Sequence, residues 1–144
     1  MKKKNYYYCD MDGVLADFNR EENAIGRFDK EKYFFLRLKP IEENCKAIND
    51  LIHKGESVRI ISVSPNKKAD FSKIMWLKIY FPFLKKSNII LLRPNQNKCD
   101  YMKTKQGILF DDYGKNCYLW ETKKNNKSFK IYKEKNIKYY LTTM

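Results

Sequence analysis

Residues 6–19 read YYYCDMDGVLADFN, an apolar run that passes directly into acidic side chains. Tyrosine is enriched in strands, so the start of this stretch predicts a short buried strand. Side chains at positions i and i+2 of a strand point to the same side. Asp10 and Asp12 can therefore face one point in space, where the chain turns at Gly13. A strand suited to burial that ends in two carboxylates predicts a chemical site at its carboxyl end.

Short apolar strands alternate with helical segments along the rest of the chain. Helical spacing of apolar residues predicts helices over 41–55 and 69–81, with Trp76 in the core. Shorter helical segments are expected at 97–104 and 115–122, the second with Trp120 in the core, whereas 136–144 remains unassigned. This alternation favours an α/β domain with a mostly parallel sheet. The strands are expected at 5–11, 57–63, 88–93, 107–114 and 128–133.

Polar side chains end three of these predicted strands. Sheets of this class bind ligands beyond the carboxyl ends of their strands, so side chains at those ends can meet. We therefore expect one shared site built from three pairs: Asp10 with Asp12, Ser62 with Ser64, and Asp111 with Asp112.

The four acids of this expected site favour a metal ion. Clustered carboxylates repel one another and raise each other's pKa unless a cation lies among them. Ligand sets made only of oxygen suit magnesium better than zinc, and the four cysteines form no C-x-x-C pair. One acidic pair is equally consistent with capping of helices and turns. Two pairs, each after an apolar strand, favour a metal site.

The chain of 144 residues carries a net charge of +13, from 30 Lys plus Arg against 17 Asp plus Glu. Such a charge suits nucleic acid, and a positive field also attracts phosphorylated substrates. Lysine far outnumbers arginine, and asparagine, tyrosine and isoleucine are abundant, as in proteins of AT-rich genomes. The lysines are also scattered along the sequence. Nucleic acid is therefore a possible partner but not the favoured one.

No stretch of about 18 apolar residues is present, so no membrane span is expected. The basic start lacks the apolar segment and cleavage site of a signal peptide. We therefore expect a cytoplasmic protein whose cysteines are reduced. The length fits one domain over residues 1–144, and the sequence leaves the oligomeric state open.

The stretch DMDGVLADF at 10–18 resembles the D-x-D-G nucleophile motif of the haloacid dehalogenase superfamily. Over a longer span, the chain resembles the cytosolic type C 5'(3')-deoxyribonucleotidase branch of this superfamily and the small bacterial and phage relatives of that branch. Four further stretches resemble other motifs of the family, in the same order along the chain. They are VRIIS at 58–62, SKIMWLKIYFP at 72–82, NQNKCDY at 95–101 and GILFDDYGKNCYLWE at 107–121. The resemblance implies a Rossmann-like, three-layer domain with a mostly parallel sheet. The family's helical cap is much reduced here, to a short insertion at about 19–39.

The resemblance also implies a reaction, the hydrolysis of phosphate monoesters through an aspartyl-phosphate. Asp10 is then the nucleophile, and Asp12 is the acid and base for the leaving group and water. Mg²⁺ is held by Asp10, the backbone carbonyl of Asp12 and Asp112. Asp111 orients a lysine or a metal-bound water.

Phosphate contacts follow from the same resemblance, with alternatives that the sequence leaves open. Ser62 is the first candidate, and Ser64 is its rival because relatives often read Thr-Ser-Pro where this chain reads SVSP. Lys98 is the expected cation on the phosphoryl group, and Lys73 is the alternative or a second contact. Phe18 either stacks on a base or packs in the core.

The implied substrate is a (deoxy)nucleoside monophosphate. Residues that grip the base from a larger cap have no counterpart in the short insertion. A phosphatase acting on a nucleic-acid 3' end or on a sugar phosphate is therefore an alternative. A non-catalytic nucleic-acid-binding protein on the same fold is another.

Overall fold

The computed structural model describes residues 4–20, 27, 31, 33–123 and 126–144. Ten of the 21 residues of the cap insertion expected at about 19–39, namely 21–26, 28–30 and 32, lie outside these described residues. The described parts of that interval form two single turns of 3-10 helix, η1 (Phe18–Arg20) and η2 (Phe35–Arg37).

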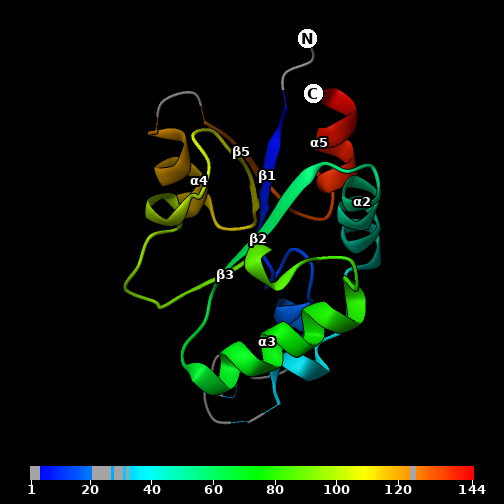
Figure 1. Cartoon of the computed structure of the whole chain (residues 1–144), viewed down its shortest axis with the longest axis vertical. Coiled ribbons are helices and arrows are strands. Elements are labelled where there is room, and N and C mark those ends of the chain that lie inside the picture. Colours follow the sequence, from blue (N-terminus) through cyan, green and yellow to red (C-terminus); the bar gives the residue numbers. More distant parts are fainter. Residues whose placement is uncertain (1–3, 21–26, 28–30, 32, 124–125) are drawn as a thin grey trace.

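Five strands of the described chain form one sheet in the order β3-β2-β1-β4-β5 (Figure 1). They are β1 (Tyr6–Cys9), β2 (Ser57–Val63), β3 (Ile89–Leu92), β4 (Ile108–Asp111) and β5 (Lys127–Lys130). Every pairing is parallel, so the prediction of a mostly parallel sheet is confirmed. The strand order reverses at β1, which lies between β2 and β4. Such a switch point opens a crevice beyond the carboxyl ends of the two strands beside it.

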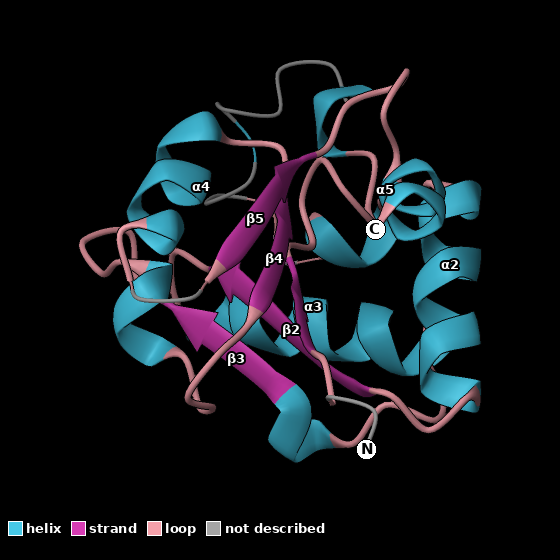
Figure 2. Ribbon diagram, turned by 90° about the horizontal axis from the view of Figure 1, so that it is seen from above, coloured by secondary structure: helices cyan, strands magenta, loops and turns pink. Residues whose placement is uncertain are grey.

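Helices cover both faces of this sheet, as a three-layer α/β fold requires. Helix α4 (Gly114–Glu121) lies on one side, and α2 (Glu42–His53) and α5 (Ile137–Thr143) lie on the other (Figure 2). Helix α3 (Lys67–Tyr80) packs against η2. No helix within the described ranges is both long and apolar enough to cross a membrane.

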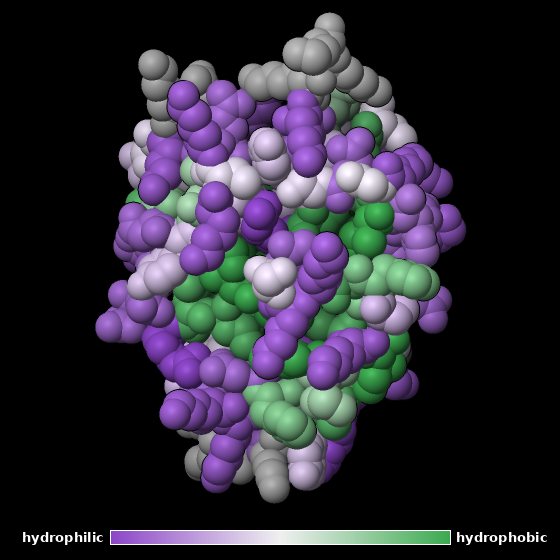
Figure 3. Space-filling view, in the orientation of Figure 1, coloured by the Kyte–Doolittle hydropathy of each residue, from purple (hydrophilic) through white to green (hydrophobic). Residues whose placement is uncertain are grey.

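Alternating side chains of β1 separate the core into two clusters. Tyr7 and Cys9 belong to the larger cluster, which includes Trp76 of α3. Tyr8 points to the opposite face and packs against Trp120 of α4, with ring centroids 5.1 Å apart. Both tryptophans are fully buried, as predicted, and their indole N–H groups donate to backbone carbonyls. Polar side chains cover much of the outer face seen in Figure 3, with apolar side chains between them.

Local capping explains where the helices differ from their predicted ranges. Helix α3 begins at Lys67, two residues before the predicted start, because the Asn66 side chain accepts the Ala69 N–H at 2.9 Å. The unassigned C-terminal residues form α5, whose first turn is capped in the same way by Asn136. The short helix expected at 97–104 is a 3-10 turn, η4 (Lys98–Tyr101).

Candidate active site

Asp10 lies where β1 ends, at the switch point of the sheet. Its backbone N–H donates to the carbonyl of Phe110 at 2.9 Å, which joins the ends of β1 and β4. The chain then turns tightly, with Gly13 at a φ of +86°. Glycine adopts this left-handed conformation without steric cost. The strand end and the turn together hold Asp10 and Asp12 at the crevice.

A buried lysine, Lys98, contacts one acid of each pair, Asp10 of the first and Asp111 of the second. Lys98 Nζ in η4 lies 2.8 Å from Asp10 Oδ1 and 2.7 Å from Asp111 Oδ2. Its side chain is only 3% exposed. Burial lowers the pKa of Lys98, but Asp10 and Asp111 outweigh that effect, and the pKa lies above its ordinary value. The ammonium group is therefore charged at neutral pH.

The pKa of Asp10 is raised well above its ordinary value, first by burial and then by the charge of Asp111. Lys98 acts in the opposite direction but does not cancel these effects. Burial, followed by Asp111, also raises the pKa of Asp112. A single lysine thus leaves excess negative charge in the cluster, and a further cation would stabilise its ionised form.

Asp111 and Asp112 differ in how much of each carboxylate is already engaged. Asp111 is fully buried and accepts from the Tyr113 N–H at 3.0 Å, from Asn116 Nδ2 at 3.1 Å and from Lys98. Both of its oxygens therefore have protein donors. Asp112 is half-buried and faces the crevice, which fits a ligand role for Asp112 and an orienting role for Asp111.

The cluster suits a hard divalent cation. Carboxylate oxygens of Asp10, Asp111 and Asp112 lie within 4.8 Å of one another. Space beside them depends on Gly13, because a Cβ there would lie 2.1 Å from Asp112 Oδ2. An all-oxygen donor set of this kind is typical of magnesium sites.

A second buried lysine, Lys73, contacts Asp12. Its Nζ lies 2.7 Å from Asp12 Oδ2 and 2.9 Å from Ser62 Oγ, and it also donates to the Val63 carbonyl. These three acceptors use the three protons of the ammonium group. The fully buried group also lies 4.4 Å from the centroid of the Phe35 ring. This geometry favours an orienting role for Lys73 over a direct phosphate contact.

Asp12 keeps its other oxygen for further chemistry. Within the described part of the chain, Asp12 Oδ1 is buried and has no hydrogen-bond partner. A buried acceptor without a partner is costly, so a group from outside the protein chain is expected beside it. A leaving-group oxygen or a water molecule would supply it.

A cavity of about 220 Å³ brings the predicted residues together. Ser62 lines this cavity, whereas Ser64 does not, and Ser64 Oγ donates to the Asn66 carbonyl at 3.4 Å. The geometry therefore favours Ser62 as the phosphate contact. The lining residues are Asp10, Asp12, Ser62, Val63, Lys98, Asp111, Asp112, Tyr113 and Asn116.

Phe18 lies apart from this small cavity, in an aromatic group with Phe34 and Phe35. Ring centroids are 5.8 Å apart for Phe18 and Phe34, and 6.2 Å apart for Phe18 and Phe35. Its stacking on a base stays a prediction. Sequence reasoning missed Asn116 and Tyr113, although their position directly after the second acid pair offered a signal.

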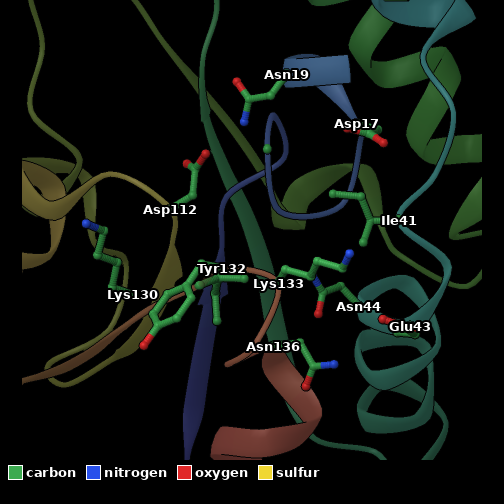
Figure 4. Close-up of a pocket in the computed structure, with 12 residues that line it drawn as sticks. Asp17, Asn19, Ile41, Glu43, Asn44, Asp112, Lys130, Tyr132, Lys133 and Asn136 are labelled. Atoms are coloured by element: carbon green, nitrogen blue, oxygen red, sulfur yellow. The ribbon is translucent and has the colours of Figure 1, made fainter. Parts of the chain in front are cut away.

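A second, larger cavity of about 880 Å³ adjoins the first, and Asp112 lines both (Figure 4). Its walls come from the turn after β1, the start of α2 and the connection from β5 to α5. The lining residues are Gly13, Asp17, Asn19, Ile41, Glu43, Asn44, Asp112, Lys130, Ile131, Tyr132, Lys133 and Asn136.

A protein-family model matches residues 19–137, and it is described as "5' nucleotidase, deoxy (Pyrimidine), cytosolic type C protein". This span includes Ser62, Lys73, Lys98 and the late acid pair, and it begins after Asp10 and Asp12. Among solved structures, a chain of the "Structure of Pnkp1/Rnl/Hen1 complex" matches with a TM-score of 0.56 and 14% identity. The alignment covers 88% of this chain and 45% of that one, and it shows likeness of fold alone. No curated protein matches.

Proposed function

The chain belongs to the cytosolic type C 5'-nucleotidase family of the haloacid dehalogenase superfamily, and from this premise we propose that it is a magnesium-dependent phosphatase of nucleotides. The substrates would be (deoxy)nucleoside monophosphates in the cytoplasm, hydrolysed through an aspartyl-phosphate. One observation carries the proposal. A buried carboxylate, Asp10, meets a buried lysine, Lys98, and two further acids at the switch point of a parallel sheet.

Magnesium would be held by Asp10, the backbone carbonyl of Asp12 and Asp112. The acidic cluster and the space left by Gly13 support this assignment. When bound, the ion neutralises charge, so that an anionic carboxylate can approach an anionic phosphate.

Asp10 would act as the nucleophile. A carboxylate oxygen of Asp10 forms a bond to phosphorus while the bond from phosphorus to the ester oxygen breaks. Lys98 and Ser62 would hold the phosphoryl oxygens during this transfer. Positioned charge of this kind supplies most of the catalysis in phosphoryl transfer.

Asp12 would move the protons. Oδ1, which has no hydrogen-bond partner within the described chain, would give a proton to the leaving oxygen. The same oxygen would then take a proton from the water that cleaves the aspartyl-phosphate, releasing inorganic phosphate and restoring Asp10. Lys73 fixes Oδ2 and so holds the carboxylate of Asp12, a residue that lines the small cavity, in one orientation. General acid–base help of this kind contributes roughly 10²–10⁴-fold.

A panel of phosphate monoesters assayed with magnesium and with EDTA tests this function. We expect nucleoside monophosphates to be hydrolysed with magnesium, with rates falling to background in EDTA and returning when magnesium is added back. The panel includes a sugar phosphate and a phosphodiester, of which the diester should remain intact. Equal rates with and without magnesium, or no hydrolysis of any monoester, would contradict the proposal.

Replacing Gly13 with alanine should weaken magnesium binding by about 10–100-fold, the usual cost of disturbing the support of a metal ligand. The new Cβ would lie 2.1 Å from Asp112 Oδ2, which must then move. Gly55→Ala is a matched control, because Gly55 also has a positive φ, of +81°, but open space around it. Both variants carry backbone strain of about 1–2 kcal/mol. Magnesium titrations followed by thermal unfolding and by rate should separate them, and equal affinities would refute the metal assignment.

A further inference from the structure

The 880 Å³ groove is larger than one phosphate requires and lies directly beside the acidic cluster. Its volume lies near the top of the usual range for ligand sites, about 300–1,000 Å³. Asp112 and Lys130 lie on one side of it, Ile41 and Asn44 on the other, and Tyr132 and Lys133 between them (Figure 4). A group bound at the cluster through its phosphate would thus extend into this groove.

Buried contacts hold the walls of the groove in place. Asn44 Nδ2 donates to the Val14 carbonyl at 2.8 Å, and Asn44 Oδ1 accepts the Ile137 N–H at 3.0 Å. This one side chain joins the turn after β1 to the start of α5. The Ile131 N–H donates to the Asp111 carbonyl at 2.8 Å, which fixes the end of β5 beside the acid pair. The groove is therefore a built feature of the fold.

The C-terminal segment that forms one wall of the groove is rich in lysine, and two of its lysines lie on that wall. Residues 127–138 read KSFKIYKEKNIK, with five exposed lysines and one acid, Glu134. Lys130 and Lys133 line the groove. Lys130 is also the neighbour of Asp111 in the pairing of β4 with β5. The lysines that look scattered in sequence thus include a group at the mouth of the candidate active site.

Exposed aromatic rings accompany these lysines. Tyr132 lines the groove and is 44% exposed, and Tyr113 lines the small cavity and is 57% exposed. Backbone hydrogen bonds between Tyr132 and Lys135 close a tight turn that presents Lys133. One wall of the groove thus carries two lysines and an exposed aromatic ring. On platforms for single-stranded nucleic acid, bases stack on aromatic rings and phosphates pair with basic side chains.

The opposite wall is acidic, with Asp17 and Glu43. Carboxylates repel phosphates but accept hydrogen bonds from base amino groups and sugar hydroxyls. A strand bound here would be oriented by this distribution of charge, with its phosphates along Lys130 and Lys133 and its bases and sugars toward α2.

We propose that this groove binds a single-stranded nucleic acid whose terminal phosphate enters the small cavity, so that the favoured substrate class is a phosphorylated nucleic-acid end. The inference rests on the proposed phosphatase function. A nucleoside monophosphate occupies only the part of the groove beside Asp112, whereas the nucleotides next to a terminal phosphate reach Tyr132 and the lysines.

Rates on strands and on mononucleotides test this proposal. The substrates are octathymidylates with a 3'- or a 5'-phosphate and the matching thymidine monophosphates. We expect kcat/KM at 50 mM salt to be at least about tenfold higher for the better strand than for its mononucleotide. In the double variant Lys130→Gln/Lys133→Gln, that ratio should fall about tenfold. The slope of log(kcat/KM) for the strand against log salt should become shallower by about 1.4, at roughly 0.7 for each phosphate that no longer pairs with a lysine.

Lys85→Gln/Lys86→Gln is the matched control. It removes the same charge from two exposed lysines that precede β3, at the other edge of the sheet from β5. It should leave the ratio and the salt slope unchanged. A wild-type ratio near one, or equal losses in the two double variants, would overturn the proposal.

A binding measurement separates failure of the groove from failure of the phosphatase proposal. Fluorescence anisotropy of a labelled 3'-phosphorylated octathymidylate is followed with the Asp10→Asn protein, alone and combined with each lysine pair. The groove is supported if Lys130→Gln/Lys133→Gln weakens binding by at least about tenfold and Lys85→Gln/Lys86→Gln does not, even if no monoester is hydrolysed. Tyr132→Leu should weaken binding by about fivefold or more, because a base can no longer stack on the ring. Equal binding by all these proteins would overturn the groove while leaving the phosphatase proposal intact.

Discussion

Replacing Asp10 with asparagine should lower kcat by at least about 10⁴-fold, the scale seen when a covalent nucleophile is removed. The amide has the same shape as the carboxylate but cannot form the aspartyl-phosphate. The fold should persist, because burial and Asp111 already disfavour the charged form of Asp10. Lys98 also keeps Asp111 as a partner, at 2.7 Å. Steady-state rates on a nucleoside monophosphate, with urea unfolding in parallel, measure the two effects separately.

Asp50→Asn is the control for this substitution. Asp50 lies in α2 and pairs with Lys46 on the surface, far in sequence and in the fold from the acidic cluster. The same chemical change there should leave kcat within about twofold, because exposed ion pairs contribute little. If the Asp10→Asn protein kept more than about one hundredth of the wild-type rate, Asp10 would not be the nucleophile.

Replacing Lys98 with methionine should damage both catalysis and stability. We expect kcat/KM to fall about 10²–10³-fold, as for other losses of a positioned charge. The free energy of unfolding in EDTA should also fall by about 3–5 kcal/mol, because the buried carboxylates of Asp10 and Asp111 lose their cation. Magnesium should restore part of that stability, since it would return positive charge to the same cluster.

Two variants complete this test. Lys46→Met removes an exposed lysine that also pairs with an aspartate, and it should cost only about 0.3–0.5 kcal/mol. Lys98→Arg keeps the charge in a bulkier group and separates the loss of charge from the change in shape. A Lys98→Met protein as stable as the wild type in EDTA would show that Lys98 does not balance the buried acids.

Much of the fold followed from local sequence patterns. The strands predicted at 5–11, 57–63 and 107–114 were found as β1, β2 and β4, but β1 ends at Cys9 and β4 at Asp111, so Asp12 and Asp112 lie beyond the strands. Acids placed after two of these strands were expected to meet, and Asp10, Asp111 and Asp112 do cluster, because parallel strands deliver their carboxyl ends to one edge. Helix ends were less accurate, since a side-chain cap such as Asn66 depends on one hydrogen bond rather than on a repeated pattern.

The choice among chemically equivalent side chains could not be made from the sequence. Lys73 and Lys98 were alternatives for the phosphate contact. In the structure, Lys73 contacts Asp12, which lies 61 residues earlier in the chain, and Lys98 contacts Asp10, which lies 88 residues earlier. Ser62 and Ser64 both lie at the carboxyl end of β2, and only the first lines the cavity. Such assignments depend on which loops meet across the sheet, and no short-range pattern encodes that meeting.

The sequence by itself determined the parallel α/β architecture, the two acid pairs and the oxygen chemistry of the site, because strand periodicity and residue type are local properties. Only the tertiary structure decided that Lys98 lies between Asp10 and Asp111, that Lys73 contacts Asp12, and that Lys130 and Lys133 line the groove. These outcomes follow from strand order and from the packing of α5 against α2, which join residues far apart in the chain.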